Sequence, residues 1–264
     1  MDFFVASLLA VIEGITEFLP ISSTGHMILV EDYLKLGTDA TFADTFMVAI
    51  QLPAILAVVV YFWNVLWPFG RTKDTAEIIW LWIKIVAAFL PAAVLGFLFD
   101  DLIEAWLFNS VTVALALIVG GIILIALELR PPRDAMPTVH DISLGKGILI
   151  GLFQCLAMIP GTSRSAATII GGMLLGASRP AAAEFSFFLA IPTMLGATTL
   201  KMLKNGLDFT PHQWALLAVG SVVSFVVAYA VVAAFMRYIR TRSFAPFGYY
   251  RIALGLVVLL LLVL

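Results

Sequence analysis

Residues 13–26 read EGITEFLPISSTGH, and this stretch interrupts an apolar segment that begins at residue 2. Pro20 lacks a backbone N–H and disfavours helix in the residue before it, so the segment should break into two half-helices here. A second apolar stretch, residues 146–178, is interrupted in the same way by MIPGTSRSA at 158–166. Each proline is followed by small hydroxyl residues, so both breaks bring polar groups into an apolar chain.

The rest of the chain has the composition of a membrane protein. Of its 264 residues, 62% are hydrophobic and 12% are charged, and the mean hydropathy is +1.07, well beyond that of a soluble domain. A helix needs about 20 apolar residues to cross a bilayer. The segments long and apolar enough for this are residues 43–65, 78–99, 111–129, 182–203, 214–236 and 248–264. The net charge of -2 provides no basic field for nucleic acid. We therefore expect an all-α polytopic membrane protein with one integral domain, residues 1–264, and no nucleic-acid partner.

An internal repeat relates the two breaks. Each break is followed at a closely similar distance by a Phe and then a Pro, in ADTFMVAIQLPAIL (43–56) and in AAEFSFFLAIPTML (182–195). The spacing from Phe to Pro is identical in the two segments. This matched order predicts a duplication with halves at about 1–129 and 130–264.

Loop charge predicts how the halves are oriented, because cytoplasmic loops carry the excess of Lys and Arg. If each broken stretch dips into the bilayer and returns to its own side, the basic loops share one face: Arg71, Lys73, Arg130, Arg133, Lys146, Arg237, Arg240 and Arg242. The opposite face then receives the acidic cluster Asp100, Asp101 and Glu104. This predicts two re-entrant helix-loop-helix pairs beside six spanning helices, in an inverted-topology repeat. In such repeats the functional site lies near the midplane, where the broken helices meet.

Glu13 and Glu17 are four residues apart in an apolar helix, which places both carboxylates on one face. Charges at membrane depth are costly unless paired and are functional candidates. Two close carboxylates also repel each other unless a cation lies between them. The pair therefore indicates a divalent metal site or an acid/base pair. The alternative is a surface helix whose glutamates face water.

The segment after the first break supplies Ser22, Ser23, Thr24 and His26. Hydroxyl residues at the start of a helix are ordinary N-caps. The same geometry also forms an anion site, because unsatisfied N–H groups and the helix dipole point at one place. A lone histidine is usually structural, but His26 lies within reach of the hydroxyls and the carboxylate pair, which favours a functional role.

The segment after the second break offers hydroxyls and a guanidinium, from Thr162, Ser163, Arg164 and Ser165. Arginine suits bidentate contact with phosphate oxygens and keeps its charge at ordinary pH. At membrane depth Arg164 requires an anionic partner, either one of the two glutamates or a substrate phosphate. Thr168 lies one turn further on the same face and is expected to help line the pocket. Other polar residues in or beside the spans are expected to pack or to lie at interfaces: Gln51, Glu128, Gln154 and Glu184.

Together, the two breaks offer the groups that phosphoryl transfer requires: cations or cation ligands to neutralise charge, and a nucleophile that can be placed in line. The rival interpretation is a transporter or flippase, because inverted repeats with broken helices facing an anion are also a transporter architecture. A purely structural membrane protein would leave Arg164 and two glutamates at depth unexplained.

The two motifs EGITEFLPISSTGH (13–26) and PGTSRSAATIIGGM (160–173), with EFSFFLAIP (184–192), resemble the undecaprenyl-diphosphate phosphatase family of the bacitracin-resistance type. Its members are bacterial membrane enzymes that recycle the lipid carrier for cell-wall synthesis. The resemblance covers nearly the whole chain. One departure is Ala166, where the family usually has glycine, and we expect this to change a helix contact without abolishing activity.

The resemblance implies that Glu13 and Glu17 form the catalytic glutamate motif and that the diphosphate pocket is lined by Ser23, Thr24, His26, Ser163 and Arg164. It also implies a divalent cation, Mg or Ca, and a site in the bacterial inner membrane that opens to the periplasmic side. The expected substrate is a polyprenyl diphosphate lipid. The nucleophile stays open between His26, Ser23 and a metal-activated water. A homodimer is a possible assembly, but the sequence does not give the oligomeric state.

Overall fold

The computed structural model describes residues 1–30, 34–69, 75–129, 136–206 and 208–261, apart from the side chains of residues 100, 101 and 104. Within these ranges the chain is helical and forms no β-strand. Its helices are α1 (Asp2–Thr16), α2 (Ser23–Val30), α3 (Ala40–Ala49), α4 (Gln51–Tyr61), α5 (Trp63–Leu66), α6 (Thr75–Leu107), α7 (Ser110–Leu129), η1 (Val139–Asp141), α8 (Leu144–Gln154), η2 (Cys155–Met158), α9 (Arg164–Leu174), α10 (Arg179–Asn205), α11 (Pro211–Ile239) and α12 (Ala245–Leu261).

Five segments in the described part are long and apolar enough to cross a membrane: Ala40–Tyr61, Thr75–Phe99, Ser110–Leu129, Arg179–Asn205 and Pro211–Ile239. They correspond to five of the six expected spans, and the sixth, 248–264, is represented by α12. The prediction of an all-helical, multi-pass membrane protein is confirmed.

The structure corrects some expected helix boundaries. The expected span 43–65 is interrupted between α3 and α4 at Ile50, because the ring of Pro53 disfavours a helical carbonyl four residues earlier, at Ala49. The span expected to end at residue 99 continues in α6 to Leu107. Helical hydrogen bonding is set by the backbone, so a helix can extend beyond the apolar segment from which it is predicted.

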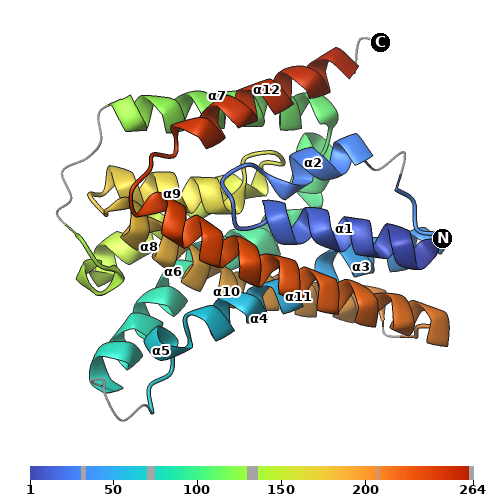
Figure 1. Cartoon of the computed structure of the whole chain (residues 1–264), viewed down its shortest axis with the longest axis horizontal. Coiled ribbons are helices and arrows are strands. Elements are labelled where there is room, and N and C mark those ends of the chain that lie inside the picture. The colour runs from blue at the N-terminus through green and yellow to red at the C-terminus, as the bar shows by residue number, and fades with distance from the viewer. Residues whose placement is uncertain (31–33, 70–74, 130–135, 207, 262–264) are drawn as a thin grey trace.

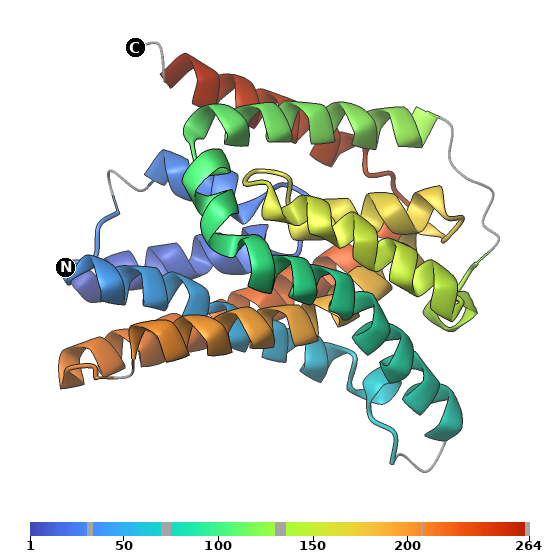
Figure 2. The ribbon, with the colours of Figure 1, turned by 180° about the vertical axis from the view of Figure 1, so that it is seen from behind.

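Both predicted breaks are present. The first separates α1, which ends at Thr16, from α2, and the second separates η2 from α9. In Figures 1 and 2, α1 runs inward from the end of the molecule where the N-terminus is marked, and α2 returns toward it. The pair α8 and α9 does the same from the opposite end. The two turns meet in the interior, where the Ser165 hydroxyl donates to the carbonyl of Leu19 at 2.9 Å.

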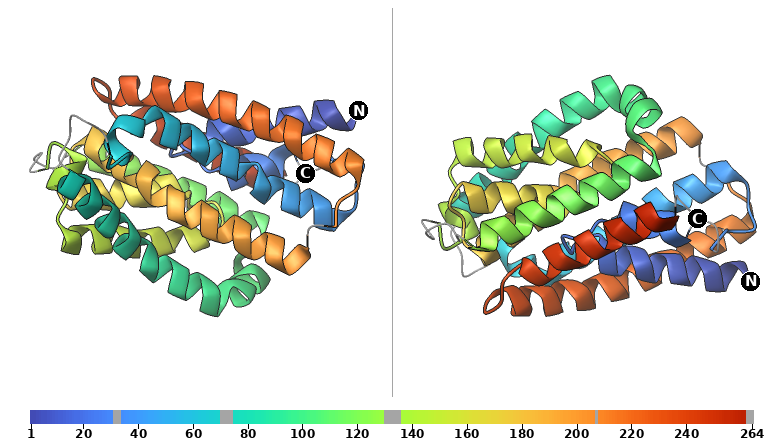
Figure 3. Two further views of the ribbon diagram at one scale, coloured as in Figure 1. Left: turned by 90° about the horizontal axis from the view of Figure 1, so that it is seen from below. Right: turned by 90° about the horizontal axis from the view of Figure 1, so that it is seen from above.

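The long helices surround these turns. α7 and α12 lie side by side along one edge of the molecule (Figure 1). α1 packs on α11, and α8 packs on α6, which crosses the back of the molecule (Figure 2). The helices run largely along the long axis, and the N-terminus and the C-terminal end of α12 lie at the same end (Figure 3).

The loop-charge prediction can be followed only in part. Arg71, Lys73, Arg130 and Arg133 lie outside the described residues, and the side chains of Asp100, Asp101 and Glu104 are likewise outside them. The beginning of α8, near Lys146, and the end of α11, near Arg237, lie at the same end of the molecule (Figure 1).

Candidate active site

The turn before α2 and the turn before α9 share an unusual backbone conformation. Ser22 (φ 70°) and Ser163 (φ 71°) are the non-glycine residues with positive φ in the described part of the chain. Each caps the helix that follows, since the Ser22 hydroxyl accepts from the N–H of Gly25 at 3.3 Å and the Ser163 hydroxyl accepts from that of Ala166 at 3.2 Å. Such conformations cost about 1–3 kcal/mol each and persist where the surroundings enforce them. The two breaks are therefore built alike.

Glu17 joins the two turns. Its Oε1 accepts a hydrogen bond from Nη2 of Arg164 at 3.1 Å, and its Oε2 accepts one from the Ser23 hydroxyl at 2.9 Å. The carboxylate and guanidinium side chains are only 9% and 11% exposed. Nη1 of Arg164 donates to the carbonyl of Ser186 in α10 at 3.0 Å, which fixes the plane of the guanidinium. The Ser23 hydroxyl, which is a candidate nucleophile, the Glu17 carboxylate and the Arg164 guanidinium are thus held together, although Arg164 lies far from the other two in the sequence.

Glu13 lies one turn before Glu17 and is almost fully buried. Its Oε1 is buried and has no hydrogen-bond partner. Among the described residues no three His, Cys, Asp or Glu side chains gather into a metal-binding group. Two carboxylates with nearby hydroxyls nevertheless suit Mg or Ca, because Mg in particular is often held by one or two carboxylates together with water and substrate phosphates. The unpartnered oxygen of Glu13 fits such an ion.

A polar cavity of about 160 Å³ lies between the two turns. It is lined by Glu17, Ser22, Ser23, Thr24, Gln51, Ala157, Gly161, Ser163 and Arg164. Six of the predicted site residues therefore share one cavity. Gln51, which we expected to pack, lines it too, because α4 lies beside the first turn and directs this side chain inward.

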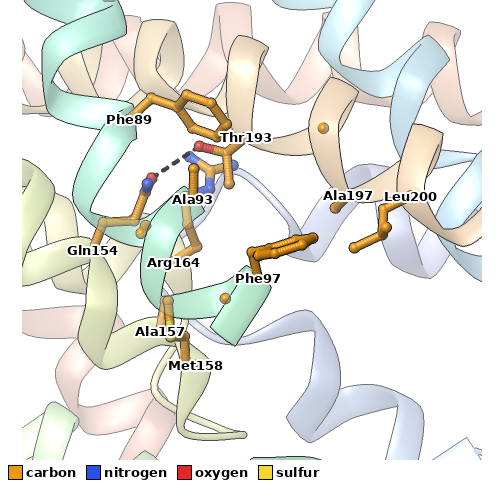
Figure 4. Close-up of a pocket in the computed structure, with 13 residues that line it drawn as sticks. Phe89, Ala93, Phe97, Gln154, Ala157, Met158, Arg164, Thr193, Ala197 and Leu200 are labelled. Carbon is orange, nitrogen blue, oxygen red and sulfur yellow. Dashed lines mark hydrogen bonds between the residues drawn. The ribbon is translucent and has the colours of Figure 1, made fainter. Parts of the chain in front are cut away.

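A larger cavity of about 480 Å³ adjoins the polar one (Figure 4). The two share Ala157 and Arg164. Its walls are mostly apolar and come from α6 and α10, with side chains such as Phe89, Phe97 and Leu200. Arg164 thus lies at the boundary between the polar cavity and the apolar cavity.

Other predicted site residues lie beside or behind the polar cavity. Both ring nitrogens of His26 are engaged, Nδ1 with the carbonyl of Ser22 at 2.8 Å and Nε2 with the hydroxyl of Tyr250 at 2.7 Å. Ser165 is fully buried and its hydroxyl donates to the carbonyl of Leu19. Thr168 is also fully buried, and its hydroxyl lies 2.6 Å from that of Ser186. Sequence spacing placed these side chains near the site, and the Ser165 hydroxyl does lie 3.0 Å from that of Ser163, but neither Ser165 nor Thr168 lines the cavity.

Arg251 is a residue that sequence reasoning missed. Its side chain is fully buried in α12, and its guanidinium donates to carbonyl oxygens of both turns, at Pro20 and at Gly161. The available signal was an arginine inside the predicted span 248–264. An arginine near the beginning of a span also fits a side chain that reaches the membrane surface, so this signal alone does not place Arg251 at the turns.

The chain is similar in sequence to known proteins along nearly its whole length. The family model described as bacitracin resistance protein BacA matches residues 6–257. The chain belongs to the BacA family. Similar proteins include undecaprenyl-diphosphatase 1 of Clostridioides difficile, 53% identical over 98% of this chain and 96% of that protein. The undecaprenyl-diphosphatase of Fusobacterium nucleatum is 53% identical over 97% of this chain and 98% of its own, and that of Enterococcus faecalis is 48% identical over 96% and 94%. The BacA match contains both motifs, so the resemblance inferred from them is confirmed.

Proposed function

We propose that this BacA-family chain is a membrane hydrolase that converts undecaprenyl diphosphate to undecaprenyl phosphate and inorganic phosphate, and so recycles the lipid carrier for cell-wall synthesis. Relatives that carry the name undecaprenyl-diphosphatase match it over nearly their whole length. The observation that carries the proposal is the Ser23, Glu17 and Arg164 arrangement in a buried polar cavity.

The geometry favours Ser23 as the nucleophile. Its hydroxyl lines the cavity and donates to Glu17, the pairing of nucleophile and base that activates a hydroxyl. In this scheme the Ser23 oxygen attacks the terminal phosphorus, its proton passes to Glu17, and the bond to the bridging oxygen breaks to release polyprenyl phosphate. Water then cleaves the phosphoserine to give inorganic phosphate and free Ser23. His26 is less suited to attack, since both of its ring nitrogens are already engaged.

Arg164 neutralises charge on the transferred phosphoryl group in this proposal, and the N-termini of α2 and α9 direct backbone N–H groups toward the same cavity. We further propose that Glu13 and Glu17 would hold a divalent cation, Mg or Ca. When bound, the cation would supply additional neutralisation of the diphosphate. Ser22, Thr24 and Ser163 are proposed to contact phosphate oxygens, because all three line the cavity.

The apolar cavity beside Arg164 is suited to the isoprenoid units next to the diphosphate (Figure 4). Its boundary with the polar cavity lies at Ala157 and Arg164, where the polar head of a lipid would meet its tail. The proposed substrate would therefore be bound with its charges among the turns and its tail between α6 and α10.

The membrane arrangement we propose is one integral domain with six spans and two re-entrant pairs, α1–α2 and α8–α9, in an inverted repeat. The packing supports this, because α1 of the first half packs on α11 of the second as α8 of the second packs on α6 of the first. With the basic loops in the cytoplasm, the first pair would enter from the periplasmic side of the bacterial inner membrane, and the site would open there. The homodimer stays a prediction.

The test is phosphate release from undecaprenyl diphosphate by purified protein in detergent, with magnesium or calcium and with EDTA. Wild type should release phosphate only with the metal, and Glu17→Gln and Arg164→Ala should lose this activity while remaining folded. Glu77→Gln is a matched control, because this exposed carboxylate contacts His140 away from the cavity. If folded wild type releases no phosphate with either metal, the proposed hydrolase activity is refuted. Movement of the lipid across liposome membranes by the Glu17→Gln protein would then favour the transporter.

A further inference from the structure

Arg251 is a buried cation held by carbonyl groups. Its Nε donates to the carbonyl of Leu117 at 3.4 Å and its Nη2 to that of Ala116 at 3.0 Å, both in α7. Nη1 donates to the carbonyl of Pro20 at 3.4 Å, and Nη2 also to that of Gly161 at 3.2 Å. Among the described residues no carboxylate pairs with this guanidinium. Burying a cation without an anionic partner is costly, so its position needs an explanation beyond the packing of α12 on α7.

The two loop carbonyls that Arg251 contacts occupy equivalent positions. Pro20 lies two residues before Ser22, and Gly161 lies two residues before Ser163, the two serines with positive φ. A single guanidinium therefore contacts both turns, in each case at the carbonyl two residues before the serine with positive φ. Because its donors form a planar, rigid fork, their spacing fixes one turn relative to the other.

The surroundings are shaped to admit this guanidinium. A Cβ at Gly120 in α7 would collide with Nη2 of Arg251, so only glycine leaves the space. Gly161 itself has φ 89°, and a Cβ there would meet the carbonyl oxygen of Val113. The neighbouring residue in α12, Tyr250, holds His26 through its hydroxyl. One turn of α12 thus contacts the first turn, the second turn and the histidine of the motif.

We propose that Arg251 is a positioning residue that sets the two turns against each other, so that Ser23 and Glu17 of the first half face Arg164 of the second across one cavity. The inference rests on the proposed hydrolysis for its effect on rate. Arg251 does not line the polar cavity and acts on the reaction through the turns.

The test compares Arg251→Lys with Arg179→Lys. Lysine keeps the charge but cannot span four carbonyl groups in one plane. Arg179 is the matched control, because its Nε donates to Glu128 at 2.8 Å and so joins helices away from the cavity. At a temperature well below every unfolding midpoint, we expect Arg251→Lys to lower kcat about 10- to 100-fold, since a misplacement of about 1 Å can cost about 100-fold. Arg179→Lys should lower the thermal midpoint and leave kcat within about two-fold of wild type.

A second readout does not depend on the reaction. Hydrogen exchange should become faster in Arg251→Lys in both peptides that contain the turns, residues 17–26 and 159–167, and should be unchanged there in Arg179→Lys. If wild type releases no phosphate, the proposed function fails, yet this exchange result still tests the positioning role. Exchange unchanged in both turns, with kcat near that of wild type, would overturn the inference.

Gly120→Ala covers the case in which Arg251→Lys does not fold. This variant keeps the arginine, and because the added Cβ would collide with Nη2, we expect the guanidinium to shift relative to the turns. It should show the same loss of kcat and the same faster exchange. Wild-type values for both measurements in folded Gly120→Ala protein would also overturn the inference.

Discussion

Replacing Arg164 with glutamine should destabilise the protein more than replacing both Arg164 and Glu17. The two side chains are 3.1 Å apart and about nine-tenths buried, so removing only the cation leaves Glu17 as an uncompensated anion beside Glu13. Breaking a buried pair in this way typically costs about 3–5 kcal/mol. Adding Glu17→Gln removes that anion and should recover about 1–3 kcal/mol, the size of coupling expected between residues in contact.

Activity should follow a different pattern. Arg164→Gln, Glu17→Gln and the double variant should each lose phosphate release by about 100-fold or more, the usual cost of removing one group that stabilises transition-state charge. Stability and activity therefore separate: the double variant is more stable than Arg164→Gln but no more active.

The assay is equilibrium unfolding of the four proteins in mixed detergent micelles, with phosphate release measured on the same preparations. Unfolding is followed in EDTA, so that no added cation can neutralise the glutamates in place of the arginine. The reasoning is refuted if the losses of the two single variants simply add in the double variant, since Glu17 and Arg164 would then not be coupled as their contact implies.

Three further results are expected. A quenched reaction should yield phosphoserine at Ser23, and Ser23→Ala should abolish it; solvent oxygen in the released phosphate with no trapped intermediate would indicate attack by water. Ala93→Phe, which fills the apolar cavity, should raise KM for undecaprenyl diphosphate but not for a prenyl diphosphate of one or two units, and an equal rise for both would contradict the proposed tail site. Hydrogen bonds from the hydroxyl and backbone N–H of Thr138 hold the pKa of the Asp141 carboxyl below its ordinary value. The stability they contribute is therefore present at neutral pH and lost as pH falls through the folded pKa. Asp141→Ala should unfold at a lower temperature than wild type at pH 7, and the difference should shrink below about pH 4, whereas a constant difference would contradict the linkage.

Hydropathy predicted the long helices, apart from the interruption at Ile50 and the extension of α6 to Leu107, and the prolines predicted the two breaks. Lipid leaves a helix as the simplest way to satisfy the backbone of a long apolar segment, so hydropathy along the sequence predicts spans almost directly. Pro20 and Pro160 interrupt two such segments for a reason that is local to the backbone. The start of α2 at Ser23 and of α9 at Arg164 follows from this.

The charged residues of the candidate site could be predicted from the sequence, because charged side chains are rare at membrane depth and are usually functional there. Glu17 and Arg164 were selected because each needed an opposite charge or a ligand, and the structure brings them to 3.1 Å. Spacing alone could not show which way neighbouring side chains point. Ser165 and Thr168 were therefore expected at the cavity, although their hydroxyls hold α9 to its neighbours instead.

The sequence by itself determined that this is a helical membrane protein. It also showed that two of its apolar segments are broken and that hydroxyl, carboxylate and guanidinium side chains lie at the breaks. Only the tertiary structure decided that Gln51 helps to line the polar cavity and that Arg251 contacts both turns. The physical reason is that hydropathy and proline effects act along the chain, whereas these contacts depend on how α4, α7 and α12 rotate and pack against turns more than 25 residues away in the sequence.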